Sequence, residues 1–345
     1  VALIGFPSVG KSTLLSQLTG TESEAAAYEF TTLTCIPGVI HYNDAKIQLL
    51  DLPGIIEGAS EGKGRGRQVI AVAKSSDLIL MVLDACKSEA ANSRYAHKDI
   101  LTRELEACGL RLNKRPPLIY WKRKKAGGVQ VNNTVPGGLT KIDEKTVVRV
   151  LQEYKIHHAE ILFREDCDVD QLIDVLEGNR KYVRCLYVYN KVDALTIEEV
   201  NTLSRRPDSV CISCYMNLGM EYLLKRVWDA MGLVRVYTKK MGEKVDLEEP
   251  VVLSDARGGI TVKHFCAQLH ADLPRQLKYA LVWGTSPKHY GQRVGLKHGL
   301  EDEDVVQIVK SDRHHYEDGV GRFSTKKRND PARIQDRVKK EKLKT

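Results

Sequence analysis

The segment Gly5-Phe-Pro-Ser-Val-Gly-Lys-Ser-Thr13 limits the possible folds more than any other part of the chain. It fits the pattern Gly-x-x-x-x-Gly-Lys-Ser/Thr, follows an apolar run at residues 1–4 and opens a helical pattern at residues 12–18. In a strand, glycine turn and helix of this order, backbone N–H groups and the helix N-terminus converge on one point that attracts phosphate. The sequence therefore predicts an α/β domain with a phosphate-binding loop rather than a chance glycine turn.

The residues of this loop have distinct expected tasks. Lys11 would bridge the terminal phosphates of a nucleotide, and the Ser12 hydroxyl would ligate Mg²⁺. The glycines let the backbone N–H groups turn toward the phosphates. The predicted nucleotide-binding residues of the loop are Pro7, Ser8, Val9, Gly10, Lys11, Ser12 and Thr13.

A second motif, Asp51-Leu-Pro-Gly54, follows an apolar strand predicted at residues 45–50. A carboxylate at the tip of a buried strand beside the loop is suited to hold Mg²⁺ through water, and the Gly54 amide to sense the terminal phosphate. Asp-x-x-Gly alone is a weak motif, so its weight comes from its order and spacing. We expect Asp51 to bind metal and nucleotide, and Gly54 to act in catalysis with Lys11.

A third motif, Asn190-Lys-Val-Asp193, indicates which base is bound, and it follows a predicted strand at residues 185–189. The Asp193 carboxylate offers two acceptor oxygens to the ring N–H and the exocyclic amine of guanine, whereas adenine has no such pair of donors. After the next strand, at residues 209–212, a backbone amide would meet the guanine carbonyl. The predicted base-binding residues are Asn190, Lys191, Asp193, Ser213 and Cys214.

Two segments between these motifs are expected to respond to the nucleotide. The first, Tyr28-Glu-Phe-Thr-Thr-Leu-Thr34, contains Thr31 and Thr32, and we expect Thr32 to supply a metal-binding and catalytic hydroxyl. The alternative is that these threonines only satisfy the loop backbone. The second, residues 58–67, contains four glycines, and such backbone freedom suits a conformational switch.

The spacing between the second and third motifs predicts an insertion. Residues 51 and 190 are 139 positions apart, whereas two strand–helix units need about 60 residues at roughly 30 each. A strand at 77–84 and a helix at 92–108 come first, so the excess begins near Gly109. Strands at 128–135 and 160–163 and helices at 144–154 and 169–177 then predict a small α+β subdomain.

Two basic segments could bind nucleic acid. Lys122-Arg-Lys-Lys125 lies beside Tyr120 and Trp121, a combination typical of nucleic-acid binding, although a solvated basic hairpin is the alternative. Residues 313–345 hold 11 Lys or Arg and 5 Asp or Glu, a net +6 of the chain's +8. That segment is either an electrostatic arm for RNA or a solvated tail.

Cysteine usage and hydropathy indicate the compartment. Eight cysteines are spread along 345 residues with one close pair, Cys211-Ile-Ser-Cys214, so we expect ordinary thiols rather than disulfides, a zinc site or a redox motif. This usage favours a reducing compartment. No run approaches the roughly 18 to 20 apolar residues of a membrane span, so no membrane association is predicted.

Residues 250–310 predict a further compact unit. Strands at 251–253, 279–283 and 305–309 and a helix at 262–269 are consistent with a β-grasp module.

Together these motifs resemble the developmentally regulated GTP-binding proteins of the Obg-related GTPases. The residues that carry the resemblance are Gly5–Thr13, Tyr28–Leu33, Asp51–Gly58, Gly62–Val72 and Asn190–Asp193. The similarity runs from Val1 to about Lys310. Segments such as Thr34-Cys-Ile-Pro-Gly38 and Phe163-Arg-Glu-Asp-Cys167 are more similar to the second paralogue of that family than to the first.

The resemblance implies a Ras-like GTPase domain at 1–108 and 179–233, an inserted subdomain at 109–178, a TGS β-grasp domain at 234–311 and a basic extension at 312–345. It implies a cytoplasmic enzyme that hydrolyses GTP to GDP and phosphate with Mg²⁺. It also implies work on translating ribosomes and their RNA with a regulatory protein partner of the DFRP type. Ser8 stands where potassium-dependent relatives carry asparagine, so stimulation by K⁺ stays open.

Ile55 stands where Ras-like GTPases place a water-orienting glutamine, so slow intrinsic hydrolysis is expected. Glu57, a switch backbone or a partner would then supply the missing group. Two alternatives remain. The chain could be a ribosome- or RNA-binding scaffold in which nucleotide is mainly structural, or an ATPase, against which the intact Asn190-Lys-Val-Asp193 motif argues.

Overall fold

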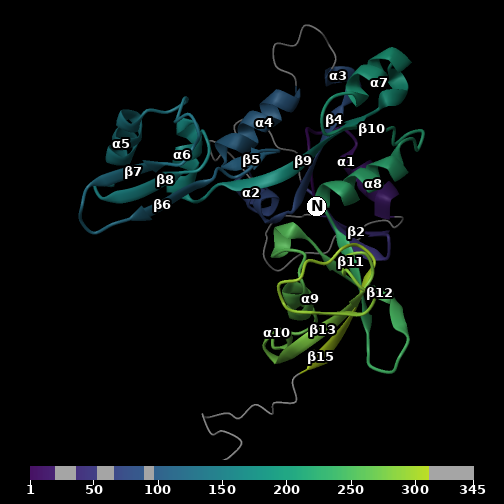
Figure 1. Ribbon diagram of the computed structural model, residues 1–345. Helices are drawn as coiled ribbons and strands as arrows, with labels where there is room; N and C mark the ends of the chain where they lie inside the picture. The colour runs from purple at the N-terminus through teal and green to yellow at the C-terminus, as the bar shows by residue number, and fades with distance from the viewer. Residues whose placement is uncertain (20–35, 53–65, 89–96, 311–345) are drawn as a thin grey trace, which may run out of the picture. The chain divides into compact units, whose positions relative to one another are not determined.

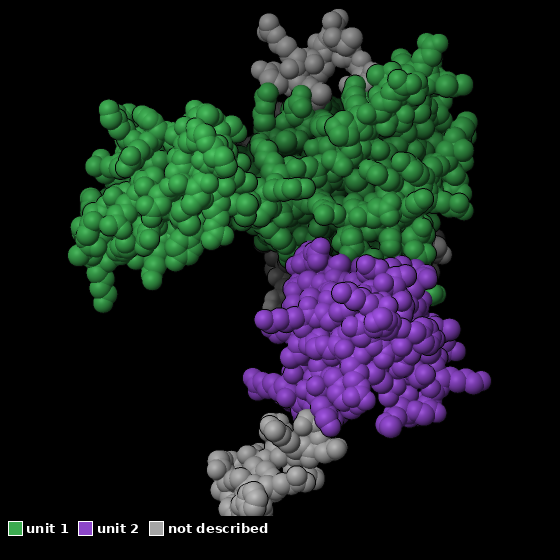
Figure 2. Space-filling model, viewed as in Figure 1, with its two compact units in different colours: residues 1–233 green, residues 234–345 purple. Residues whose placement is uncertain are grey.

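The computed structural model describes residues 1–19, 36–52, 66–88 and 97–310. The chain divides into two compact units, residues 1–233 and 234–345 (Figure 2). Each unit is built on its own sheets and has its own hydrophobic core.

A seven-stranded sheet forms the frame of the first unit (Figure 1). Its strands lie in the order β10-β9-β4-β1-β3-β2, with β5 beside β9, and all neighbours are parallel except the antiparallel pair β2 and β3. Because the parallel strands point the same way, the residues that follow them gather at one edge. The strands are β1 (Ala2–Ile4), β2 (Ile36–Tyr42), β3 (Ala45–Asp51), β4 (Leu78–Asp84), β5 (Leu110–Leu112), β9 (Lys181–Asn190) and β10 (Ser209–Cys211).

Helices cover both faces of this sheet. Along β4, Leu78, Leu80 and Val82 pack with α1 and α8, whereas Ile79 and Met81 pack with α2, α4 and α7. Every residue of β4 is buried, which explains its continuous apolar sequence. The predicted α/β class is therefore confirmed. The helices are α1 (Lys11–Thr19), α2 (Gly66–Ser75), α3 (Ala85–Ser88), α4 (His97–Ala107), α7 (Ile197–Ser204) and α8 (Met220–Met231).

The short strand β5 belongs to this sheet, although it falls inside the range predicted for the insertion. Leu110 pairs with Lys181 and Leu112 with Val183 of β9. The cause is the length of β9, because β4 pairs only with residues 184–190 and leaves the first part of that edge open. Strand β5 fills the open positions and buries both of its leucines.

The insertion contains a three-stranded sheet in the order β6-β8-β7, with β6 antiparallel and β7 parallel to β8. Two amphipathic helices pack their apolar sides on one face of it, around Phe163, Val147 and Leu172. The basic run begins on β6, a strand that the sequence did not predict. The elements are β6 (Ile119–Arg123), β7 (Val129–Asn133), α5 (Glu144–Glu153), β8 (Ala159–Phe163) and α6 (Val169–Glu177).

A buried carboxylate joins α6 to the seven-stranded sheet. The Asp174 side chain is 4% exposed and accepts two hydrogen bonds of 2.7 Å from the Arg111 guanidinium on β5. Arg180 lies 3.3 Å from the same carboxylate, and the Tyr182 hydroxyl donates to it at 3.2 Å. The bond to Asp174 raises the pKa of Arg111, and burial raises the pKa of Tyr182 to about 12. The arginine therefore stays charged and the tyrosine protonated at neutral pH.

The second unit contains a five-stranded sheet in the order β12-β11-β15-β13-β14. Its central pair, β11 and β15, is parallel, and the outer pairs are antiparallel. Helix α9 packs Val262, Phe265 and Cys266 on the sheet, which is the β-grasp arrangement predicted from the sequence. The elements are β11 (Val234–Lys239), β12 (Val245–Leu253), α9 (Val262–Leu269), α10 (Leu273–Gln276), β13 (Leu277–Trp283), β14 (Gln292–Val294) and β15 (Asp304–Lys310).

Each helix in the described part of the chain is too short or too polar to cross a lipid bilayer.

Removing the Asp174 carboxylate should destabilise the first unit. Asp174→Ala leaves the half-buried Arg111 without its anion and leaves Arg180 with Glu177 alone, so the free energy of unfolding should fall by about 3 kcal/mol. Asp170→Ala, at an exposed position of the same helix, should change it by less than about 0.5 kcal/mol. Urea denaturation of both variants measures the difference, and equal midpoints would contradict a stabilising role for Asp174.

Candidate functional site

The predicted phosphate loop connects β1 to α1 at the carboxyl edge of the sheet. Gly10 has φ of +95°, and a Cβ placed there would lie 2.4 Å from the Asn190 side-chain nitrogen. A Cβ at Gly5 would lie 2.4 Å from the Val82 carbonyl oxygen of β4. Both glycines are therefore required by close packing against neighbouring segments.

The Lys11 ammonium lies inside this loop. It donates hydrogen bonds of 3.0 Å to the carbonyl oxygens of Gly5 and Phe6, and the residue is 8% exposed. Burial lowers the pKa of Lys11, and the charge of nearby Asp51 opposes that shift. The lysine thus stabilises the curved loop through these two bonds. Its positive charge lies next to the loop backbone, where phosphate is expected to bind.

Ser12 and Asp51 come from different elements and meet beside the loop. The Ser12 hydroxyl donates to Asp51 Oδ2 at 2.8 Å from the first turn of α1, and Asp51 ends β3. Burial raises the pKa of Asp51, although the Ser12 hydrogen bond and the charge of Lys11 act the other way. Its other oxygen, Oδ1, is buried and has no hydrogen-bond partner among the described residues. The Ser12 hydroxyl and a carboxylate group with one oxygen not hydrogen-bonded within the described residues therefore lie next to each other.

Asn190 connects three segments of the site. Its amide nitrogen donates to the Val9 carbonyl at 2.9 Å, and its oxygen accepts from the backbone N–H groups of Lys191 at 2.8 Å and Cys214 at 3.1 Å. The residue is 2% exposed. The bonds to Val9 and Cys214 join segments that are far apart in the sequence. The phosphate loop and the base loops are therefore held in one arrangement.

Lys191 supports the loop from the outside. Its backbone has φ of +67°, and its ammonium donates to the Ser8 carbonyl at 3.0 Å and to Asp84 Oδ2 at 2.8 Å. Burial would raise the pKa of Asp84. The hydrogen bond and charge of Lys191, together with two backbone N–H groups, outweigh that effect and lower the pKa. The ion pair fixes the ends of β4 and β9 to the phosphate loop.

Asp193 lies exposed in the short 3₁₀ turn after β9 (Val192–Ala194). The Ser213 hydroxyl donates to one of its carboxylate oxygens at 2.5 Å and accepts the Met216 backbone N–H at 3.1 Å. Gln17 of α1 donates to the Cys214 carbonyl oxygen. The two predicted base loops are therefore bonded to each other and to the helix that follows the phosphate loop.

The structure brings most of the predicted site residues together. Thr32 and Gly54, with Thr31, Ile55 and Glu57, lie outside the described residues. Sequence reasoning missed Asp84 and Gln17. An acidic residue at the end of a fully apolar strand, as Asp84 is, was the available signal, whereas nothing in the sequence distinguishes Gln17.

Cys211 and Cys214 are both free thiols, and burial raises the pKa of each. No cluster of three or more His, Cys, Asp or Glu side chains that could hold a metal occurs in the described ranges.

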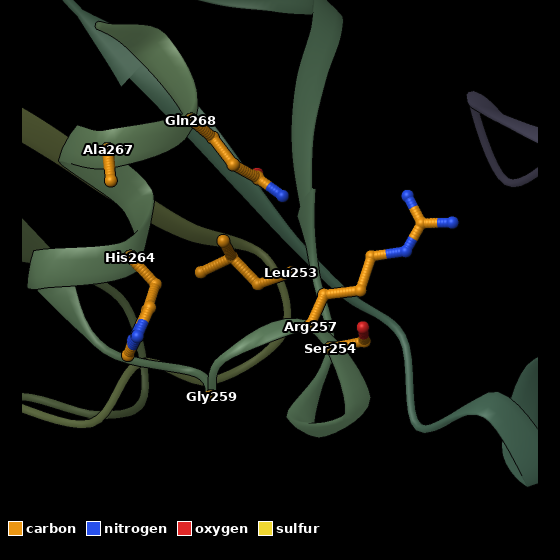
Figure 3. Close-up of a pocket in the computed structure, with 7 residues that line it drawn as sticks. All are labelled: Leu253, Ser254, Arg257, Gly259, His264, Ala267 and Gln268. Atoms are coloured by element: carbon orange, nitrogen blue, oxygen red, sulfur yellow. The ribbon is translucent and has the colours of Figure 1, made fainter. Parts of the chain in front are cut away.

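The second unit contains a small pocket of its own, between the end of β12 and α9 (Figure 3). Its volume of about 170 Å³ is below the roughly 300 to 1,000 Å³ of typical ligand pockets. None of the predicted nucleotide-site residues lines it. Its lining residues are Leu253, Ser254, Arg257, Gly259, His264, Ala267 and Gln268.

The arrangement at the edge of the large sheet defines a class of protein. A glycine-rich loop after β1, a carboxylate at the end of β3 and an Asn-Lys-x-Asp motif after β9 converge there, as in a P-loop GTPase. Residues 1–123 match the family described as 50S ribosome-binding GTPase, residues 126–233 the C-terminal region of that domain, and residues 234–310 the TGS domain.

Close relatives identify the family within that class. Developmentally-regulated G-protein 2 of Arabidopsis thaliana is 66% identical over 344 residues, which are 100% of this chain and 84% of that protein. Human Developmentally-regulated GTP-binding protein 2 is 58% identical over 310 residues, 90% of this chain and 82% of that protein. The chain belongs to the developmentally regulated GTP-binding protein family and is a GTPase, as the resemblance implied.

Among solved structures, the G domain of the T. maritima FeoB iron transporter aligns with a TM-score of 0.32 and 16% identity. The alignment covers 66% of this chain and 96% of that one. A similarity at this level carries no argument about function.

Gly10→Ala should weaken GTP binding by at least about tenfold, because a methyl group at positive φ would strain the loop and displace Asn190. Gly137→Ala is the matched control, since that glycine also has positive φ, +91°, but its Cβ would meet nothing within 4 Å. Titration with a fluorescent GTP analogue compares the two variants. Parent-like affinity of Gly10→Ala would contradict the close packing described here.

Proposed function

We propose that this chain is a GTP-driven switch in translation, acting on ribosomes in the cytoplasm with a regulatory protein partner. The observation that carries the proposal is the hydrogen bonding of Asn190, which joins the phosphate loop to the base loops. A nucleotide that bridges these loops would be bound as one unit, and its terminal phosphate would lie beside the segments that follow Asp51 and precede β2. Hydrolysis would then change those segments.

The phosphate end of the proposed site is assigned as follows. Lys11 and the loop amides hold the phosphates, and Ser12, Thr32 and Asp51 hold Mg²⁺ directly or through water. The buried Asp51 Oδ1 without a partner among the described residues, next to the Ser12 hydroxyl, fits a hard cation with oxygen ligands. When bound, Mg²⁺ supplies positive charge to the phosphate oxygens. Lys11 and the backbone N–H of Gly54 also stabilise the negative charge on these phosphate oxygens.

The base end selects guanine in this proposal. Asp193 accepts from guanine's two donors, with its orientation set by the Ser213 hydroxyl. Asn190 supports the base site indirectly, because its side-chain oxygen accepts the backbone N–H groups of Lys191 and Cys214 and holds both residues in place. A backbone amide after β10 meets the guanine carbonyl.

The ribosomal role is supported by charge and by the family descriptions. Residues 1–123 match a family described as ribosome-binding GTPases. The net +6 of residues 313–345 and the basic run that starts on β6 are complementary to RNA phosphates.

A partner surface is supported by exposed apolar side chains close to the base loops. Tyr215 is 88% exposed, and Met216, Leu218 and Tyr222 are each between 51% and 55% exposed. Apolar side chains gathered in this way mark protein-binding surfaces. We propose that the regulatory partner, of the DFRP type, contacts this segment and stabilises the base loops.

Base selection can be tested by changing one acceptor. Asp193→Asn puts a donor opposite a guanine donor, so GTP affinity should fall by about 2 to 4 kcal/mol. Xanthosine triphosphate, which has a carbonyl in place of the amine, should bind the variant better than GTP does. Asp229→Asn, an exposed change of the same kind on α8, should bind GTP as the parent does. Competition by ATP at GTP-like concentrations, or undiminished GTP binding by Asp193→Asn, would contradict the assignment.

The ribosomal role can be tested by sedimentation. Deleting residues 313–345 should weaken association with purified ribosomes and reduce the salt slope by about 0.7 to 0.9 for each RNA phosphate that the segment neutralises in the parent. GTP affinity of the free variant should not change, because no predicted nucleotide ligand lies in that segment.

Turnover on the same ribosomes separates the switch from a scaffold. A switch should hydrolyse GTP faster with ribosomes than alone, whereas a scaffold should hydrolyse it at one rate in both. Co-sedimentation without any change in rate would favour the scaffold, and absence of co-sedimentation would contradict both.

A further inference from the structure

The sheet of the insertion has two very different faces. Along each strand alternate side chains enter the core, and α5 and α6 cover that face (Figure 1). Ile119 and Trp121 of β6 point to this covered side, as do Ile161 and Phe163 of β8. The intervening residues therefore lie on the opposite, open face of the sheet.

Residues on the open face form two rows across the strands. Tyr120 is paired with Leu162, which is paired with Asn132, and Lys122 is paired with Glu160, which is paired with Gln130. The Tyr120 ring lies beside Leu162 and is a large apolar surface, and the residue is 51% exposed. An aromatic side chain therefore lies on the edge strand β6 with Lys122 two residues along, and the side-chain amides lie across the face on β7.

The charge of this face is positive. Its acidic residue on β8, Glu160, lies 3.0 Å from the Lys124 ammonium and is compensated there. Lys122 is exposed on β6, and Arg164 is exposed directly after β8, where its N–H continues the ladder to the Leu118 carbonyl. The face therefore has two exposed cations beside the exposed ring, a pattern complementary to an anion with flat apolar groups.

Single-stranded RNA has that chemistry. Unstacked bases stack on exposed aromatic rings of open sheets, amide side chains bond to their edges, and cations contact the phosphates. A duplex keeps its bases stacked inside and cannot place one on Tyr120. An acidic protein segment would use the cations but not the ring.

We propose that the open face of the β6-β8-β7 sheet binds a single-stranded RNA segment, with one base stacked on Tyr120 and phosphates at Lys122 and Arg164. Asn132 lies where it can bond to a base edge, and Gln130, whose side-chain oxygen accepts from Lys124 at 2.7 Å, offers its amide N–H groups. The inference rests on the proposed role in translation and deepens it, because it names the surface of the insertion that would contact RNA.

The stacking is tested with the full chain and a fluorescein-labelled 12-nucleotide RNA of mixed sequence, by fluorescence anisotropy. Tyr120→Ala should weaken binding by about fivefold or more, and Tyr120→Phe, which keeps the ring, should stay within about twofold of the parent. Tyr154→Ala removes a tyrosine that is 39% exposed directly after α5 and should have no effect. Equal affinities of the parent and Tyr120→Ala would overturn the proposal.

The charge contribution is tested with matched double variants. Lys122→Ser with Arg164→Ser should lower RNA affinity and flatten its salt dependence. Lys145→Ser with Arg149→Ser removes the same charge from exposed positions of α5 and should have a much smaller effect. If both doubles weaken binding equally, only net charge matters and the face is not the site. The same holds if a 12-base-pair RNA duplex or poly-glutamate competes as well as the single strand.

Cross-linking locates the contact within the full chain. RNA that contains 4-thiouridine should cross-link to a peptide with Tyr120, and cross-links confined to residues 313–345 would overturn the proposal. The outcome for ribosomes is separate. If RNA binding depends on Tyr120 but the protein does not associate with ribosomes, the proposed role in translation is wrong and the RNA-binding face stands. If the protein associates with ribosomes but Tyr120→Ala binds RNA as the parent does, the RNA-binding face is wrong and the proposed role in translation stands.

Discussion

The buried amide of Asn190 is the contact on which the nucleotide site depends. It is bonded to the phosphate loop through Val9, and to Cys214 after the last strand of the sheet. A side chain that is 2% exposed and bonded at both amide atoms has one favourable orientation, because any other leaves buried polar groups unpaired. Gly10 has no side chain for the same reason, since the Asn190 amide occupies that space.

Around this amide, the phosphate loop is held by cations on both sides. Lys11 bonds to the Gly5 and Phe6 carbonyls from inside, and Lys191 bonds to the Ser8 carbonyl from outside while paired with Asp84. Because these carbonyl oxygens already accept hydrogen bonds from ammonium groups, the N–H groups of the loop stay available for an anion. The loop is therefore preorganised for an anion, which lowers the cost of ordering it when nucleotide binds.

The sequence predicted the parts of this fold that are local or chemically specific. The phosphate loop, the GTPase class and the β-grasp unit are confirmed, since each depends on a short pattern or on periodic burial. Strands β5 and β6 were not predicted. A three-residue strand such as β5 has too short a pattern to be recognised without its neighbour β9, and in β6 the basic residues Lys122 and Arg123 interrupt the apolar pattern. The bonds of Asp84 and Gln17 depend on loops distant in sequence. The catalytic roles of Thr32 and Gly54 stay predictions.

The pairing of β4 with β9 has a consequence for the growing chain. Leu78 pairs with Arg184, 106 residues later, and the whole insertion is made in between. At about 5 to 20 residues per second of synthesis, the central strand waits roughly 5 to 20 seconds for its partner, with the backbone N–H and C=O groups of one edge unpaired. The nascent protein therefore passes through a stage in which the phosphate loop has been made but Asn190 and Cys214, which are bonded to each other in the finished fold and to that loop through Asn190, have not.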